Sequence, residues 1–199
     1  MPSAVHHQQQ PADEPMSKPA KTWIALFRGI NVGGNNPLPM KALALLIEEL
    51  GGTQVKTYIQ SGNVIFQAAG SNAAWSARIE NAVSRQFGFA PRVLLLSRNE
   101  LEKAATANPF PQAIAEPRTL HLAFLAERPT RPDIAGLNAI KRGAEAFVLD
   151  GKVFYLHAPA GIGQSTLAAR YEKLLGVPAT ARNWNTVVKV LELAAQQGL

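Results

Sequence analysis

The chain has 199 residues, of which 47% are hydrophobic and 17% are charged, a balance typical of a globular protein. It contains no cysteine, which excludes disulfides, thiol nucleophiles and thiolate metal sites, and no apolar run reaches the ~20 residues of a membrane span. The formal net charge is +6. Without the two acids and one lysine of residues 1–20, the rest carries 20 − 1 = 19 basic and 14 − 2 = 12 acidic residues, or +7, which favours anionic partners such as nucleic acid.

Residues 1–20 are rich in proline, glutamine and serine, with His6 and His7 near the start. Such a composition buries too little apolar surface to offset the entropy of ordering, so we predict a disordered tail. Metal binding by the histidine pair is the alternative. Because the amino terminus lacks the apolar core of a signal peptide, we expect a cytoplasmic protein.

The first predicted unit spans residues 21–97. Helical spacing of apolar residues predicts one helix beginning near Pro39 and another capped by Ser71 or Asn72. Ser61-Gly62 is a hairpin signal between the two middle strands. The strands are predicted over residues 23–27, 54–60, 63–67 and 92–96.

Residues 98–118 are predicted to be a connecting helix and a linker. Ser97 and Glu100 have the spacing of a capping box, and Asn108-Pro-Phe-Pro111 breaks the helix. Residues 119–199 then repeat the order of the first unit. Their predicted elements are strand 119–126, helix 132–141, strands 145–149 and 152–157 around Asp150-Gly151, helix 165–175, strand 177–181 and a terminal helix capped by Asn183.

The repeated order βαββαβ predicts an α+β fold of two ferredoxin-like halves, a duplicated architecture with an added C-terminal helix. A faint internal echo supports the duplication. Gly62-Asn-Val-Ile-Phe66 resembles Gly151-Lys-Val-Phe-Tyr155 at equivalent places in the two halves.

Polar and glycine-containing segments gather at the predicted strand ends. In a ferredoxin-like half, the loop after the first strand and the hairpin tip lie at the same edge of the sheet. This topology predicts a first cluster made of Arg28, Asn31, Gly33, Gly34, Ser61, Gly62 and Asn63. A second cluster, in the other half, is made of Gly161, Gly163, Ser165, Arg182, Asn183, Asn185 and Thr186. We expect both clusters to face one cleft between the halves.

These residue types suit an anion. Gly161-Ile-Gly-Gln-Ser165 precedes a helix and can offer backbone N–H groups, while Arg28 and Arg182 can supply charge-assisted hydrogen bonds. The segments lack the lysine of a P-loop and do not fit G-x-G-x-x-G. In the alternative interpretation the glycines only make turns, Ser165 and Asn183 only cap helices, and Trp184 belongs to the core.

Catalysis is left open by the sequence. His121 in a strand and His157 at a strand end are the candidates for a general base, and Ser61 or His157 for a reactive group. No carboxylate or serine partner stands at a telling position beside the histidines. No spacing of metal ligands is present, so we predict no metal site, and the sequence identifies neither a cofactor nor an oligomeric state.

Four motifs resemble those of the bacterial domain-of-unknown-function family DUF1697. They are Arg28-Gly-Ile-Asn-Val-Gly-Gly34, Tyr58-Ile-Gln-Ser-Gly-Asn-Val-Ile-Phe66, Gly161-Ile-Gly-Gln-Ser165 and Arg182-Asn-Trp-Asn-Thr186. The resemblance covers nearly everything after the tail. It implies a two-part α+β fold of ferredoxin-like halves and makes the motif residues site candidates, but it implies no activity. Members often carry a basic residue near Pro37 and near Gln164, and its absence here argues against phosphate contacts at these two positions.

We therefore expect a cytoplasmic protein that binds an anionic, phosphate-bearing ligand, a nucleotide or a nucleic acid in the cleft between the halves. Arg28 and Arg182 would bind its charge, and Ser61, Asn63 and Asn185 would hydrogen-bond to it. An enzyme that uses the same cleft is one alternative. A structural or protein-interaction module, whose motifs are only turns and caps, is another. No membrane partner is expected.

Overall fold

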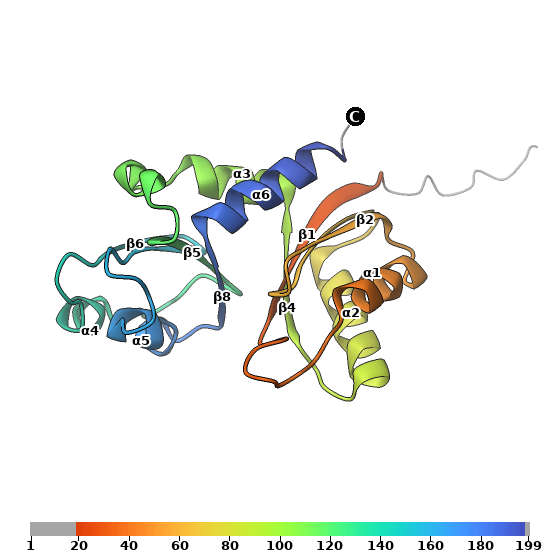
Figure 1. The fold of residues 1–199 in the computed structure, drawn as a ribbon, viewed down its shortest axis with the longest axis horizontal. Helices are drawn as coiled ribbons and strands as arrows, with labels where there is room; N and C mark the ends of the chain where they lie inside the picture. The colour runs from red at the N-terminus through yellow and green to blue at the C-terminus, as the bar shows by residue number, and fades with distance from the viewer. Residues whose placement is uncertain (1–18, 198–199) are drawn as a thin grey trace, which may run out of the picture.

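The computed structural model describes residues 19–197 and shows a mixed α+β protein with two four-stranded antiparallel sheets. Within this part of the chain there are six α-helices and one short 3-10 helix, η1. Figure 1 shows two lobes, each a sheet with helices against one face, and the helices α3 and α6 beside both. The predicted disordered tail, residues 1–20, lies almost wholly outside the described residues.

The first lobe is built from β1–β4 with α1 and α2, and its strand order is β2-β3-β1-β4. Ser71 caps α2 by accepting a hydrogen bond from the Ala74 N–H, and Gly88 ends the helix in the left-handed conformation. The bounds are β1 (Lys21–Arg28), α1 (Met40–Glu49), β2 (Thr53–Tyr58), β3 (Asn63–Ala68), α2 (Asn72–Phe87) and β4 (Arg92–Ser97).

The second lobe is built from β5–β8 with α4 and α5, and its strand order β6-β7-β5-β8 matches that of the first. The predicted capping box forms between Ser97 and Glu100 and begins α3, which links the lobes. The bounds are α3 (Arg98–Thr106), η1 (Pro111–Ala115), β5 (Leu120–Leu125), α4 (Ile134–Ala139), β6 (Ala146–Asp150), β7 (Val153–His157), α5 (Thr166–Leu175), β8 (Ala179–Asn183) and α6 (Trp184–Ala195).

Most predicted elements differ from the structure by one or two residues at their ends, and three of these differences have a clear local setting. The strand predicted over residues 54–60 ends at Tyr58, so four residues rather than two join it to β3. The helix predicted over 132–141 is shorter, because Asp133 caps it and it ends at Ala139. The last strand begins two residues later than predicted and runs directly into α6, whose cap is Asn183.

Three hydrophobic clusters hold the fold together. One lies between the first sheet and α1 with α2, and another between the second sheet and α4 with α5. The third is shared by both lobes, because it joins Ile24 and Leu26 of β1 to Leu122 and Phe124 of β5 and to Val187 of α6. This shared cluster fixes the two lobes relative to each other.

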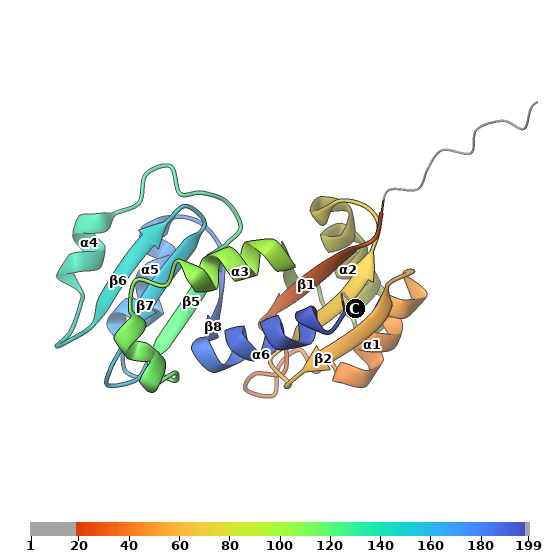
Figure 2. The same ribbon diagram turned by 90° about the horizontal axis from the view of Figure 1, so that it is seen from above.

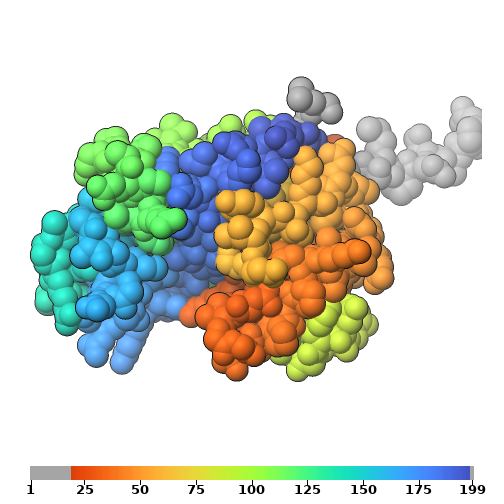
Figure 3. All heavy atoms as spheres, in the orientation of Figure 1, coloured from red at the N-terminus to blue at the C-terminus, as the bar shows by residue number. Residues whose placement is uncertain are grey.

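The helices α3 and α6 cover the shared cluster. Figure 2 shows them side by side, running across from one lobe to the other, and Figure 3 shows α6 lying over the junction. Among residues 19–197, no helix is both long and apolar enough to cross a membrane.

The outer edge of β4 is occupied by side chains of α2. The Glu80 carboxylate accepts a hydrogen bond from the Val93 N–H at 2.9 Å, and the Asn72 amide donates to the Leu95 carbonyl. These main-chain groups belong to an edge strand, and edge strands otherwise offer them to other strands. The protected edge faces β8 of the second lobe, because Val93 and Thr180 line the same cavity.

Candidate functional site

The loop after β1 and the hairpin tip of the first lobe are joined by Asn31. Its side-chain amide donates to the Leu38 and Gln60 carbonyls, at 2.9 and 3.0 Å, and its Oδ1 accepts from the Leu38 N–H at 2.7 Å. Asn31 adopts a positive φ of 54°, which asparagine tolerates better than most residues. The loop after β1 and the hairpin tip therefore lie together at one edge of the sheet, and the hydrogen bonds of Asn31 hold them in contact.

Arg182 crosses from β8 into this hairpin tip. Its side chain is buried, with 9% of its surface exposed. Every guanidinium nitrogen donates to the protein, and the acceptors are Asn63 Oδ1 and the main-chain carbonyls of Phe27, Ser61, Gly62 and Ala181. None of these acceptors is a carboxylate. Burial lowers the Arg182 pKa to about 10, so the side chain keeps its positive charge at neutral pH.

A cavity of about 370 Å³ lies beside Arg182, between the two lobes. Arg28 and Ser61 line it from the first lobe, and Tyr171 and Glu172 of α5 line it from the second. Arg28 forms an ion pair with Glu172, and 41% of its side chain remains exposed. Burial, helped by the charge of Glu172 and opposed by that of Arg28, raises the Tyr171 pKa to about 12. The Tyr171 hydroxyl is therefore protonated at neutral pH.

A second arginine, Arg92, lies beside Arg28 and was not among the candidates from the sequence. Arg92 is the cross-strand partner of Arg28 in the pairing of β1 with β4, so both side chains lie on the same face of the sheet. Together they line a cavity of about 160 Å³ that also contacts Thr180 of β8. Arg92 is exposed and forms no ion pair within residues 19–197. The sequence predicted that a strand begins at Arg92, but it did not give the register of this strand against β1. Only that register shows that Arg92 lies opposite Arg28.

The second predicted cluster is divided in the structure. Gly161, Gly163 and Ser165 line a separate cavity of about 580 Å³ together with Arg142 and Glu145. Ser165 is buried and caps α5 by accepting from the Ala168 N–H at 2.9 Å. Only Arg182 of this cluster reaches the cleft between the lobes.

Residues 183–186 form the start of α6. The Asn183 side chain accepts from the Thr186 N–H at 3.0 Å and so acts as the helix cap. Thr186 is buried and Asn185 is exposed. Trp184 packs against the hydrophobic cluster shared by the lobes. In the first lobe, Gly33 and Gly34 are exposed and have positive φ angles of 59° and 78°.

The candidates for catalysis are not assembled as an acid–base pair. Ser61 Oγ accepts a hydrogen bond from the Asn63 amide at 3.2 Å, and an amide nitrogen cannot take the serine proton. His157 packs against the ring of Phe110, with 5.8 Å between ring centroids. Within the described part of the chain, no group of three His, Cys, Asp or Glu side chains is placed to hold a metal ion.

His121 is buried on the side of β5 that faces α4 and α5, and its Nδ1 has no hydrogen-bond partner. Burial lowers the His121 pKa from its usual 6.5, and the nearby Thr119 backbone opposes this only in part. The folded protein therefore holds a neutral imidazole that gains a proton more readily once the chain unfolds.

We expect a His121→Leu variant to show this in its pH dependence. Between pH 8 and pH 5 the wild type should lose stability as the pH falls below 6.5, because the unfolded chain takes up the proton first. The variant should lose less over the same range. Urea unfolding at each pH measures the difference, and parallel curves for the two proteins would contradict a depressed His121 pKa.

Comparison with known proteins identifies relatives of the whole fold. A family model described as "Protein of unknown function (DUF1697)" matches residues 20–155. The solved structure of a conserved bacterial protein, SP0830 from Streptococcus pneumoniae, is similar with a TM-score of 0.66 and 24% sequence identity, over 88% of this chain and 99% of that chain. At this identity the likeness concerns the fold alone. No curated protein matches the sequence.

Proposed function

We propose that this chain, which belongs to the DUF1697 family of proteins of unknown function, binds an anionic small molecule in the cleft between its two lobes. The observation that carries the proposal is the pair Arg28 and Arg92, which stand directly opposite each other on neighbouring strands. Like charges in this position repel each other and destabilise a sheet. A phosphate or carboxylate between them removes the repulsion and accepts hydrogen bonds from both guanidinium groups.

The surroundings offset this positive charge only in part. Arg28, Arg92 and Arg182 line the two cavities with Glu80 and Glu172, which leaves a sum of +1. Glu172 neutralises Arg28 in part, whereas the acceptors of Arg182 are neutral. The charged groups lining the cavity beside α5 are Arg28, Glu172 and Arg182, which sum to +1. A charge buried behind the cavity wall is screened less by salt than an exposed one. Arg182 therefore favours an anion in the cleft through its field.

The size of the cleft favours a small ligand over a nucleic acid. The cavity between Arg28, Arg92 and Thr180 has a volume of only about 160 Å³ and lies between the two lobes. A polyanion needs an open, extended basic surface along which several phosphates can be contacted. We therefore choose a single phosphate or carboxylate group as the feature that the site recognises.

A finer description of the fold belongs to the same proposal. In both lobes the third strand pairs with the first and the second, and the fourth pairs with the first, always antiparallel. This order supports two ferredoxin-like halves, residues 21–97 and 119–199, produced by duplication and joined by residues 98–118. A cytoplasmic location remains part of the proposal.

Titrations with inorganic phosphate and with acetate, measured by isothermal titration calorimetry, test the site. Losing a charge-assisted hydrogen bond costs about tenfold or more in affinity, so Arg92→Gln should weaken phosphate binding by at least that factor. Higher salt should weaken binding further. Arg85→Gln, which removes the same charge from the last turn of α2, serves as the matched control and should bind like the wild type. Absence of binding by both inorganic phosphate and acetate, or equal losses in both variants, would contradict the proposal.

A further inference from the structure

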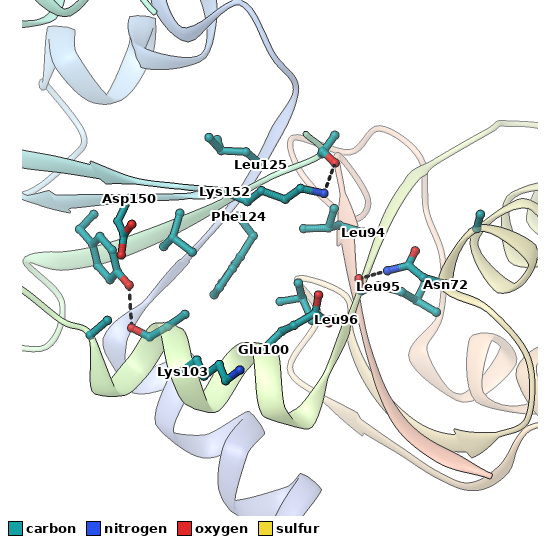
Figure 4. Close-up of a pocket in the computed structure, with 16 residues that line it drawn as sticks. Asn72, Leu94, Leu95, Leu96, Glu100, Lys103, Phe124, Leu125, Asp150 and Lys152 are labelled. Atoms are coloured by element: carbon teal, nitrogen blue, oxygen red, sulfur yellow. Dashed lines mark hydrogen bonds between the residues drawn. The ribbon is translucent and has the colours of Figure 1, made fainter. Parts of the chain in front are cut away.

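A larger, mostly apolar chamber lies next to the arginine pair. Its volume is about 560 Å³. Leu94 and Leu96 of β4 form one wall, and Phe124 of β5 and Tyr155 of β7 lie across from them. Figure 4 shows the side chains of Leu94, Leu96 and Phe124 around an open space, with α3 along one side. Leu94 and Leu96 are half-buried, so the chamber presents apolar surface to solvent.

The chamber and the cavity of the arginine pair adjoin each other along β4, and together they are called the groove. Leu94 and Phe124 line both the chamber and the small cavity that holds Arg28 and Arg92. Along β4, Arg92, Leu94 and Leu96 point to the same face, and residues two apart in a strand are separated by about 6.5–7 Å. A molecule lying along this face would therefore meet a positive charge at one end and apolar side chains at the other.

The charged residues at the rim of the chamber carry no net charge that would attract the anionic group away from Arg28 and Arg92. Two lysines and two acids line the rim, Lys103, Lys152, Glu100 and Asp150, so their charges cancel. Glu100 is already engaged in the capping box of α3, and Lys152 reaches the Ala126 carbonyl at 3.5 Å. The Tyr155 hydroxyl donates to the Ala104 carbonyl at 2.9 Å. The excess of positive charge thus lies at the Arg92 end of the groove.

We propose that the ligand is an amphipathic anion, with a short aliphatic or aromatic body in the chamber and a phosphate or carboxylate on Arg28 and Arg92. This inference rests on the proposed function and adds the apolar half of the ligand. The volume of the chamber limits the apolar body to a ring or a short chain. Sites of this kind bury most of the surface of a small ligand.

A series of alkyl phosphates tests the inference in the wild-type protein. Inorganic phosphate, methyl, butyl and hexyl phosphate are titrated by calorimetry, with hexanol and hexanoate as further probes. A fully buried methylene group contributes about fourfold in affinity. Hexyl phosphate should therefore bind about tenfold or more tightly than butyl phosphate, and hexanol should bind far more weakly than hexyl phosphate. The affinity of hexanoate relative to hexyl phosphate identifies the preferred anionic group.

Variants separate the two ends of the ligand. Leu96→Ser should weaken hexyl phosphate by about tenfold and leave inorganic phosphate unchanged, because only the body meets Leu96. Leu45→Ser, at an exposed leucine of α1, is the matched control and should change neither. Arg92→Gln should weaken both phosphates.

The outcomes distinguish this inference from the function on which it rests. Equal affinity for inorganic and hexyl phosphate, with both sensitive to Arg92→Gln, would overturn the apolar half and leave the anion site standing. Hexanol binding as tightly as hexyl phosphate would overturn the amphipathic anion. Absence of binding by every phosphate and by hexanoate would overturn both proposals.

Discussion

Replacing Arg182 by leucine should lower the free energy of unfolding by about 3 kcal/mol or more. The change leaves the buried Asn63 Oδ1 and the main-chain carbonyls of the hairpin tip without the donor that satisfies them. Each unsatisfied buried group costs about 1–3 kcal/mol, and part of this is recovered if water enters. Urea unfolding monitored by circular dichroism measures the loss.

Two further variants make this test specific to the guanidinium group. Arg182→Lys should recover only part of the stability, because an ammonium has three donors on one nitrogen and lacks the planar fork of arginine. Arg85→Leu, at an exposed position on α2, should stay within about 0.5 kcal/mol of the wild type. If Arg182→Leu were as stable as Arg85→Leu, the hydrogen bonds across the lobes would not contribute to folding.

The second large effect is expected for Gly62→Ala, which should lower the free energy of unfolding by about 2–4 kcal/mol. Gly62 has a φ of +76°, and an added Cβ would lie 2.6 Å from both Phe27 Cβ and Ile30 Cδ1. Neither neighbour can move away freely, since both are buried in the core of the first lobe. The hairpin tip, which also accepts two hydrogen bonds from Arg182 through Ser61 and Gly62, would have to shift.

Gly34→Ala separates crowding from backbone strain. Gly34 has nearly the same φ, +78°, but an added Cβ there would meet no atom within 4 Å. This variant should therefore cost only the backbone term, about 1 kcal/mol. Equal losses in the two alanine variants would show that packing against Phe27 and Ile30 contributes nothing to the cost at position 62.

The signals that predicted the fold are local in the sequence. The predicted helix caps form in the structure at Ser71, Ser97 with Glu100, Ser165 and Asn183. They were predictable because a cap depends on residues only two or three positions away. For the same reason the order of elements was predicted in both lobes. Two antiparallel sheets with helices on one face follow from that order.

The limits of elements were predicted less well where tertiary contacts decide them. Ile59 adopts a positive φ of 48°, which β-branched residues rarely do, so the strand predicted to run to residue 60 ends at Tyr58. Gly62 must approach Phe27 and Ile30, and this packing sets the shape of the tip. Neither cause can be read from the hairpin sequence alone.

The arrangement of the candidate site was predicted only in part, because it depends on register and on contacts between the lobes. Arg28 and Ser61 were expected together on grounds of strand direction, and they line one cavity. Arg92 was missed, since only the pairing of β1 with β4 shows that it faces Arg28. The hydrogen bonds of Arg182 to the first lobe span more than a hundred residues, and no local pattern indicates them. Its role as a ligand contact stays a prediction.

The occupied edge of β4 also bears on the cavity between the two lobes. Two sheets whose edge strands approach each other tend to join, and the combined sheet would seal the space between β4 and β8. Glu80 and Asn72 satisfy the main-chain groups through which such a union would begin. The same two side chains that protect this edge from pairing with another strand therefore also prevent β4 from joining β8 across the cavity.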